Sequence, residues 1–524
     1  MDIAIILAAA IIGLLLFRKV YIRLRLSRAK HPSLSGHAKM SRRMARLTSF
    51  FDYGPERYFS TDLAPAEVEA RRRAGMERLR KQFAEGSPRT LAYGESLEPA
   101  ISDVQFTSRY RVPFPFSRGL PREFRYGSVV TQTQGTRLRD LDGNWKYDVS
   151  GSYGVNVFGY DFYKECLAAG YAAAAELGPV LGPYHLAIAD NVAELKRISG
   201  LDEVSFHMSG TEAVMQAVRL ARYHTGRTHL VRLCGAYHGW WDGVQPGVGN
   251  QRRVDDVYTL ADMSPRTLKV LKTRKDIACV LINPFQALHP NADAPGDASL
   301  VNSQRRTAFD RAAYSRWLAQ LREVCTRRGI VMISDEVFAG FRLGHRGAQE
   351  YFGYQADMVT YGKTLGGGLP VAAFGGRAEV MKHLAPLGGV YQAGTLSGNP
   401  VTVAAGMATL KIIQQPDFYE LLAAQTRKLT DGLSAAAKAA GVRFAADAIG
   451  GMFGLYFDTK VPTSYAEVMQ GDKERFNRFF HKMLDAGVYF APSAFEAGFV
   501  SAQHSDAIIE ETIAAAAKAF TELG

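Results

Sequence analysis

The sequence predicts an α/β fold built around a largely parallel sheet. Beyond residue 130, short β-branched or apolar runs alternate with helical stretches, which is the pattern of strand–helix–strand units. The chain has 524 residues, of which 47% are hydrophobic and 22% are charged, enough for a large core and two to four domains or lobes. This composition excludes a disordered or collagen-like chain, and four cysteines cannot staple a chain of this length.

The first predicted element is an apolar helix. Residues 3–17 (IAIILAAAIIGLLLF) carry no charge, and residues 20–22 can extend the run toward the ~20 residues that a membrane span needs. An acid, Asp2, precedes the run and Arg18 follows it, which is the reverse of the charge order in a cleaved signal peptide. We therefore expect a single transmembrane anchor over residues 1–22, with a signal peptide and a buried core helix as the alternatives.

Basic residues follow this apolar run directly. Between Arg18 and Phe51 there are ten Lys or Arg residues and no acid, so removing them from the net charge of +12 leaves +2 for the rest. A nearly neutral body excludes nucleic acid as the main partner. The basic flank instead predicts contact with anionic membrane lipid, and the positive-inside tendency places the long body in the cytoplasm.

The cysteines agree with a cytoplasmic body. Cys166, Cys234, Cys279 and Cys325 lie far apart, with no CxxC pair and no histidine at metal-ligand spacing. We expect reduced, mostly buried thiols and no metal site.

Residues 23–105 form a basic, helical N-terminal extension. Pro65 to Glu85 predicts a helix, because proline opens it and strong helix formers fill it. We expect no catalytic residue in this extension.

The main body follows with strands and helices in alternation. The predicted strands are His229–Leu233, Ile277–Ile282, Ile330–Ser334, Met358–Tyr361 and Val371–Gly375, and the predicted helices include Glu212–Tyr223 and Asp310–Arg327. From about Gly406 the pattern predicts a smaller α+β lobe. Ligands of parallel sheets bind at the carboxyl ends of the strands, so we expect the site there.

One candidate anion site precedes a helix. The order MSGTEA at residues 208–213 places Ser209, Gly210 and Thr211 at the start of a run with helical periodicity. The free N–H groups and positive dipole end of such a helix suit a phosphate. A plain helix cap is the alternative.

An acid and a lysine mark two strand ends. Asp335 follows the apolar run IVMIS, and a buried acid there needs a cationic or N–H partner such as a protonated pyridine nitrogen. Lys363 follows the strand MVTYG and precedes the flexible loop TLGGGLP. Burial lowers the pKa of a lysine toward the free amine that a Schiff base needs. We read the combination as a covalent cofactor site.

At this point the sequence resembles a known family. The phrases DEVFAGFR, YGKTLGGGLPVAAFGG, YQAGTLSGNP and FAPSAFEAGF are similar to those of class III pyridoxal-phosphate-dependent aminotransferases, most closely glutamate-1-semialdehyde 2,1-aminomutase. The resemblance covers residues 130–520 and implies fold type I, with a mostly parallel seven-stranded sheet, and a homodimer. It implies a large domain over residues 154–405, which binds pyridoxal 5'-phosphate, and a smaller α+β domain formed by residues 106–153 and 406–524.

The resemblance also implies a role for each cofactor-binding residue. Lys363 would form the internal aldimine and move a proton, and Asp335 would pair with the pyridinium nitrogen, which keeps the ring an electron sink. The remaining roles are phosphate binding by Ser209, Gly210 and Thr211 with Thr395 of the neighbouring subunit, ring stacking by Tyr237, and packing of Val337 on the opposite face.

Substrate contacts rest on two further positions. Glu496 matches a glutamate near the substrate of aminomutase-like members, and Tyr153 falls where those enzymes place an aromatic wall, although it also suits plain packing. We expect His238 to be a structural hydrogen-bonding residue, because Lys363 already supplies the base. Met208, Asn283 and the first 100 residues depart from the family pattern and leave the substrate open.

Three functions follow. The first is an aminotransferase that moves an amino group from a small-molecule donor to an aldehyde or ketone, here a hydrophobic or acyl-chain acceptor, because an anchor suits such a substrate. The second is a true 2,1-aminomutase, and the third is a catalytically silent membrane-attached scaffold.

Overall fold

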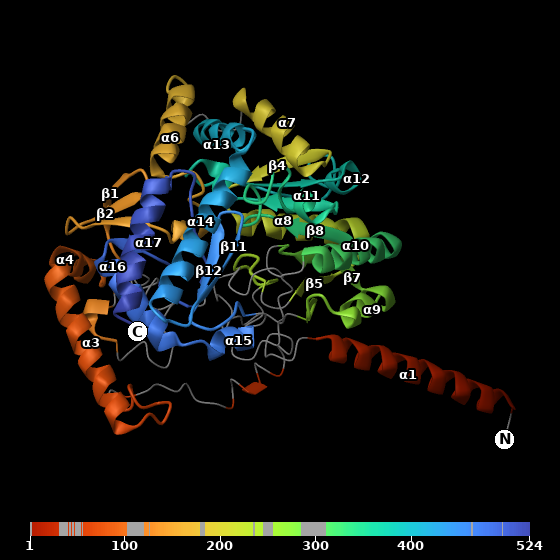
Figure 1. Ribbon diagram of the computed structural model, residues 1–524. Coiled ribbons are helices and arrows are strands. Elements are labelled where there is room, and N and C mark those ends of the chain that lie inside the picture. The colour runs from red at the N-terminus through yellow and green to blue at the C-terminus, as the bar shows by residue number, and fades with distance from the viewer. Residues whose placement is uncertain are drawn as a thin grey trace.

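The fold was obtained as a computed structural model of the full chain (Figure 1). It describes residues 3–30, 40, 43–44, 47, 54, 56–101, 120–124, 126–178, 184–233, 236–244, 255–284, 311–462, 465–494 and 496–523.

A seven-stranded sheet forms the centre of the molecule. Its strands, in spatial order, are β4 (Glu203–His207), β10 (Ala372–Gly376), β9 (Met358–Tyr361), β8 (Val331–Asp335), β7 (Ile277–Ile282), β5 (His229–Leu233) and β6 (Val257–Leu260). β10 runs antiparallel to both of its neighbours, and the other pairings are parallel. The α/β class and the mostly parallel seven-stranded sheet are confirmed.

The sheet is more varied than the five predicted strands. Each of those five is present within one residue, but β4 and β6 were not predicted individually. β4 has mixed polar residues and is only partly buried, while β6 is a four-residue edge strand. Short or half-buried strands give a weak apolar signal in the sequence. The antiparallel direction of β10 likewise has no signature in its own apolar run.

Helices cover the sheet. They are α6 (Tyr160–Ala174), α7 (Ala187–Ser199), α8 (Gly210–Thr225), α9 (Pro265–Thr273), α10 (Arg311–Arg328), α11 (Gly347–Phe352), α12 (Ala378–Met381) and α13 (Pro400–Ile412). α8 buries Val214, Val218 and Leu220 in a core cluster that also holds Ala278 and Leu281 of β7. The predicted helices at residues 212–223 and 310–327 correspond to α8 and α10; Asp310 itself lies outside the described residues.

Two smaller sheets complete the fold. One contains β1 (Val130–Gln134), β2 (Arg137–Asp140), β3 (Trp145–Asp148) and β13 (Val488–Tyr489), and the other contains β11 (Ala445–Ile449), β12 (Met452–Tyr456) and β14 (Gly498–Phe499). The helices beside them are α14 (Phe418–Ala439), α15 (Tyr465–Gln470), α16 (Lys473–Asp485) and α17 (Asp506–Thr521). β3 precedes the large sheet in the sequence and β13 follows it. Because these two strands pair, segments from before and after the large sheet form one small sheet.

The predicted domain limit between residues 405 and 406 lies inside α13. This helix packs against α6 and α7, and α7 in turn contacts β4 and β10 of the large sheet. We propose that the limit follows Ile412. Most of the segment before β1, residues 102–119, lies outside the described residues.

The N-terminal extension contains α3 (Ala66–Gly86) and α4 (Pro88–Leu97). α3 matches the predicted helix at residues 65–85, with Pro65 at the N-cap rather than inside the helix. Arg71 pairs with Glu474 at 3.2 Å, and Gln82 donates a hydrogen bond to Asp485 at 2.6 Å. α3 therefore lies along α16 through polar contacts.

α1 (Ile3–Ala29) projects from the body (Figure 1). Its segment Ile5–Ala29 is long and apolar enough to cross a membrane, and its most apolar window is entirely exposed, which argues against a core helix. The same length and composition also suit a signal sequence. The helix is longer than the predicted span, because arginine and lysine are good helix formers and continue it beyond Ile22.

Candidate active site

Asp335 is the last residue of β8 and is 4% exposed. Its Oδ2 lies 2.6 Å from Nδ1 of His238, and its Oδ1 accepts a hydrogen bond from the Thr360 hydroxyl at 2.9 Å. The backbone N–H of Val337 donates to the same Oδ1 at 3.2 Å. Three donors thus fix a buried carboxylate at the carboxyl end of the central strand.

Lys363 follows the neighbouring strand, β9, by two residues. It begins the 3₁₀ turn η6 (Lys363–Gly366) with φ of 47°, a conformation that costs energy for a residue with a side chain. Its Nζ lies 4.5 Å from the centre of the Phe338 ring. The lysine is half-buried, so it is more accessible than the sequence indicates.

The helix start at residues 209–211 has the expected form. Ser209 is the N-cap of α8, and its Oγ accepts a hydrogen bond from the N–H of Glu212 at 3.3 Å. The Glu212 side chain returns a bond to the Ser209 N–H at 3.0 Å, which completes a capping box. The Ser209 hydroxyl is thereby engaged within the cap, while the positive end of the helix dipole stays at Gly210 and Thr211.

Close packing joins this helix start to the two strand ends. A Cβ on Gly210 would lie 2.8 Å from Cγ1 of Val337, and a Cβ on Gly362 would lie 3.2 Å from the same atom. Gly362 precedes Lys363 directly, and Val337 follows Asp335 by two residues. The residues predicted to bind the phosphate, the ring and the amine therefore share one small region.

The AYHG segment closes another side of this region. His238 has a fully buried side chain that contacts Asp335, and its Nε2 makes no hydrogen bond among the described residues. A Cβ on Gly239 (φ 87°) would meet Oγ1 of Thr211 at 2.5 Å, so this segment lies against the start of α8. Tyr237, which precedes His238, is 46% exposed.

The predicted substrate residues approach from the smaller sheets. Tyr153 belongs to the 3₁₀ turn η4 (Gly151–Gly154), and its side chain lies outside the described residues. A Cβ on Gly154 would lie 2.8 Å from the Phe338 ring. Half-buried Glu496 precedes β14, whose Phe499 packs edge-on against Phe338. Both segments thus converge on the ring that Lys363 contacts.

Arg342 is a site residue that sequence reasoning missed. It is 1% exposed, and its guanidinium lies over the rings of Phe338 and Phe499 at 5.4 and 4.8 Å. None of its three nitrogens makes a hydrogen bond among the described residues, and burial lowers the pKa of Arg342 to about 10. Arg342 is the last residue of the phrase DEVFAGFR, which carries the family resemblance but does not by itself indicate a role for this arginine.

Thr395 makes no contact, among the described residues of one chain, that joins it to the other predicted site residues. It lies in an exposed turn before α13.

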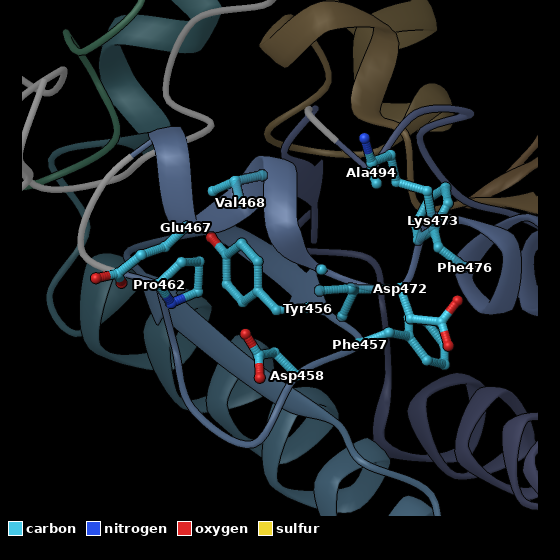
Figure 2. Close-up of a pocket in the computed structure, with 12 residues that line it drawn as sticks. Tyr456, Phe457, Asp458, Pro462, Glu467, Val468, Asp472, Lys473, Phe476 and Ala494 are labelled. Atoms are coloured by element: carbon cyan, nitrogen blue, oxygen red, sulfur yellow. The ribbon is translucent and has the colours of Figure 1, made fainter. Parts of the chain in front are cut away.

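The flanking residues Gly394 and Ser397 line an open cavity of about 420 Å³ beside His207 at the end of β4. A second, small cavity of about 20 Å³ lies between β12, α15 and α16, at Tyr456, Glu467 and Phe476 (Figure 2). Neither cavity is lined by Lys363 or Asp335.

The cysteines that the structure describes agree with the sequence. Cys166, Cys279 and Cys325 are free and buried, and burial raises the pKa of Cys166 to about 11 and of the other two to about 12. Cys234 lies outside the described residues. Among the described part of the chain, no cluster of His, Cys, Asp or Glu could hold a metal ion.

The residues fit a phosphorylated pyridine aldehyde. The first N–H groups of a helix have no partner within the helix, and Gly210 lets the start of α8 lie directly against Val337 beside Asp335. Asp335 supplies a buried anion and Lys363 supplies a primary amine, which are the partners that a pyridine nitrogen and an aldehyde require.

Known structures share this fold. An omega-transaminase from Sphaerobacter thermophilus is 26% identical, with a TM-score of 0.66, and the match covers 81% of this chain and 98% of that one. A transaminase with PLP bound is 25% identical with a TM-score of 0.62, covering 80% and 97%. A glutamate-1-semialdehyde aminomutase from Pseudomonas aeruginosa PAO1 shares the fold at 22% identity, with a TM-score of 0.67 and coverage of 87% and 99%.

A family match completes the comparison. Residues 122–516, well over half of the chain, match the family described as Aminotransferase class-III. With the strand-end carboxylate, the loop lysine and the capped helix start in place, the chain belongs to the class-III aminotransferases, enzymes that use pyridoxal phosphate to move amino groups.

Proposed function

We propose that this enzyme is an intermolecular aminotransferase, held at a membrane by α1, that aminates a carbonyl compound with a hydrophobic or acyl chain. The observation that carries the proposal is the exposed apolar helix joined to a class-III aminotransferase body. A tether places the enzyme where lipid-like aldehydes or ketones are concentrated. An enzyme with a small, soluble substrate would gain nothing from such a tether.

The site residues take the following roles in this proposal. Bound pyridoxal phosphate supplies an electron sink that makes a proton on the substrate carbon acidic. Asp335 holds its charge toward the cofactor nitrogen, because His238 and Thr360 fix the two carboxylate oxygens. Nζ of Lys363 takes that proton and returns it, and the Phe338 ring beneath the amine limits its positions.

Other residues hold the cofactor and the substrate. Gly210 and Thr211 bind the phosphate at the start of α8, with Ser209 capping that helix. Tyr237 and Val337 cover the two faces of the ring. Glu496 and Tyr153 contact the substrate, since their segments converge on Phe338 beside Lys363.

A homodimer completes the site. The support is the exposed turn that carries Thr395, together with exposed large side chains nearby in sequence: Tyr391 is 67% exposed and Leu396 is 52% exposed. Apolar surface of this kind is typical of a protein interface. In this arrangement Thr395 of one copy reaches the phosphate site of the other.

The membrane arrangement follows from charge. Arg18 and the basic residues after it stay on the cytoplasmic side, so the catalytic body is cytoplasmic and α1 is a single-pass anchor. Intact-protein mass and resistance to alkaline extraction test this. A chain shortened at its N-terminus would show that the helix is a cleaved signal sequence.

The test of the reaction compares acceptors that differ only in chain length. Purified protein in nanodiscs is mixed with candidate amines, and loss of the absorbance of the bound cofactor identifies the donor. Amination of long-chain aldehydes and ketones is then measured against their short-chain equivalents, and we expect kcat/KM to rise with chain length. Failure with every long-chain acceptor would refute the proposed specificity.

The aminomutase remains the second candidate because of Glu496. Conversion of glutamate 1-semialdehyde into 5-aminolevulinate without an added donor would decide for it. If cofactor absorbance were missing and Lys363→Ala changed nothing, the silent scaffold would replace both.

A further inference from the structure

One face of α9 carries a row of basic side chains. Arg266, Lys269, Lys272 and Lys275 are spaced by three residues, and all four are exposed. Residues three apart on a helix are neighbours on its surface, and Lys275 continues the row just beyond the helix end. The opposite face of α9 buries Leu268 and Leu271.

No acid interrupts the row between residues 265 and 275, and Asp276, which follows Lys275, pairs with Arg274. Lys269, Lys272 and Lys275 have no ion-pair partner in the part of the chain that the structure describes. Four cations therefore face solvent together, although the body as a whole is nearly neutral.

The root of α1 is docked on this helix. Leu26 and Ala29 are buried in one core cluster with Leu268 and Leu271. The Arg266 guanidinium donates a hydrogen bond to the carbonyl of Arg28 at 3.4 Å. α9 is thus bound to the last turns of α1.

A backbone connection fixes the same junction. The N–H of Ala261 donates to the carbonyl of Ala29 at 3.3 Å, and Lys30 forms an antiparallel bridge with Leu260 of β6. β6 is the edge strand of the large sheet, so the chain leaving α1 extends that sheet. Figure 1 shows α1 leaving the body beside α9. This is a fixed junction rather than a loose tether.

The spacing brings the start of the row, at Arg266, close to the bilayer surface. If the ~20 residues up to Ile22 lie in the hydrocarbon, Arg28 lies six residues further along the helix, which is about 9 Å of rise. The polar layer of a bilayer is about 5–7 Å thick on each side, and its surface potential decays over about 8 Å at physiological salt. Arg266, which contacts Arg28, falls within this range.

We propose that the basic row of α9 binds anionic lipid headgroups, so that the catalytic body rests on the membrane through the β6 edge of its sheet. The inference rests on the proposed anchoring by α1 and adds a second, electrostatic contact to it. β8, which carries Asp335, is three strands from β6, or about 14 Å across the sheet. The active site is thereby held at a set height above the lipid.

The test uses the unmodified full chain in nanodiscs of phosphatidylcholine alone or of equimolar phosphatidylcholine and phosphatidylglycerol. Acetylation rates of individual lysines are measured by mass spectrometry. We expect Lys269, Lys272 and Lys275 to react several-fold more slowly in the anionic discs and to regain their rates in high salt. Lys411 and Lys438, exposed on α13 and α14, are the internal controls and should not change.

A pair of matched variants provides a second readout. Energy transfer from the four tryptophans, all in the body, to a dansyl lipid reports how close the body lies to the bilayer. Reversing charge at Lys269, Lys272 and Lys275 to Glu should reduce transfer in anionic discs to the level in phosphatidylcholine, whereas reversal at Lys411, Arg427 and Lys438 should not.

Equal acetylation rates of the α9 lysines in both lipids would overturn the proposal. Failure of anchoring itself is distinguishable, because the chain would then not co-purify with either disc.

Discussion

Nδ1 of His238 lies 2.6 Å from Oδ2 of Asp335, and both side chains are buried. A hydrogen bond to a charged group contributes about 1.5–3 kcal/mol, and a buried carboxylate that loses a donor pays a desolvation cost. His238→Leu should lower the free energy of unfolding of the cofactor-free protein by that amount. Urea unfolding measures it, with Thr360→Val, which removes the other side-chain donor, expected to act in the same direction.

A background substitution separates this hydrogen bond from packing. In Asp335→Asn protein the carboxylate charge is gone, so His238→Leu should cost much less. An equal cost in both backgrounds would show that His238 acts only by filling space.

Gly210 is predicted to be required by its contact with Val337. A Cβ at residue 210 would lie 2.8 Å from Cγ1 of Val337, so Gly210→Ala should destabilise the protein by about 1–3 kcal/mol despite the higher helix propensity of alanine. In a Val337→Ala background the clash disappears, and the same change should be neutral or stabilising. A double-mutant cycle by urea unfolding checks this, and additive effects would contradict the packing account.

Glu336 should make stability fall as pH rises. Burial raises the pKa of this carboxyl from 4.5 to about 7, so between these values the folded protein binds a proton that the unfolded chain has lost. The free energy of unfolding should therefore decline from pH 4.5 to 7 by at most about 3 kcal/mol on this account. Glu336→Gln should remove the decline.

Exposed Glu350 provides the control for this measurement. Glu350→Gln changes an exposed side chain in the same way and should leave the decline in place. If the free energy of unfolding of the Glu336→Gln protein declined by the same amount, groups other than Glu336 would be responsible.

Mixed dimers test whether Thr395 acts across the interface. Co-expressed Lys363→Ala and Thr395→Ala chains, purified with two tags, form a dimer in which one site has both native residues only if Thr395 comes from the partner. We expect half of the sites to bind cofactor with native affinity, measured by absorbance titration. If Thr395 served its own chain, no site would be native and no high-affinity fraction would be seen.

The sequence was sufficient for much of the fold and for the places of Asp335, Lys363 and Ser209 on its elements. The strand ends at Asp335 and Lys363 and the helix start at Ser209 were predictable, because buried parallel strands are uniformly apolar and helix caps have a fixed composition. The roles that link these residues came from resemblance to a family, since their separation in sequence says nothing about contact.

Other features depend on tertiary contacts that leave no local pattern. The antiparallel direction of β10 is set by its neighbours β4 and β9, and the buried position of the Arg342 guanidinium depends on Phe338 and Phe499 meeting around it. The docking of Leu26 and Ala29 on α9 joins residues more than 230 positions apart, as the Arg28–Arg266 hydrogen bond with its separation of 238 shows.

The most direct test of the central claim is reduction of the cofactor-loaded protein with borohydride, followed by peptide mass spectrometry. We predict a pyridoxyl group on the peptide that contains Lys363, and its absence in Lys363→Ala protein. A pyridoxyl group on another lysine, or on none, would contradict the account.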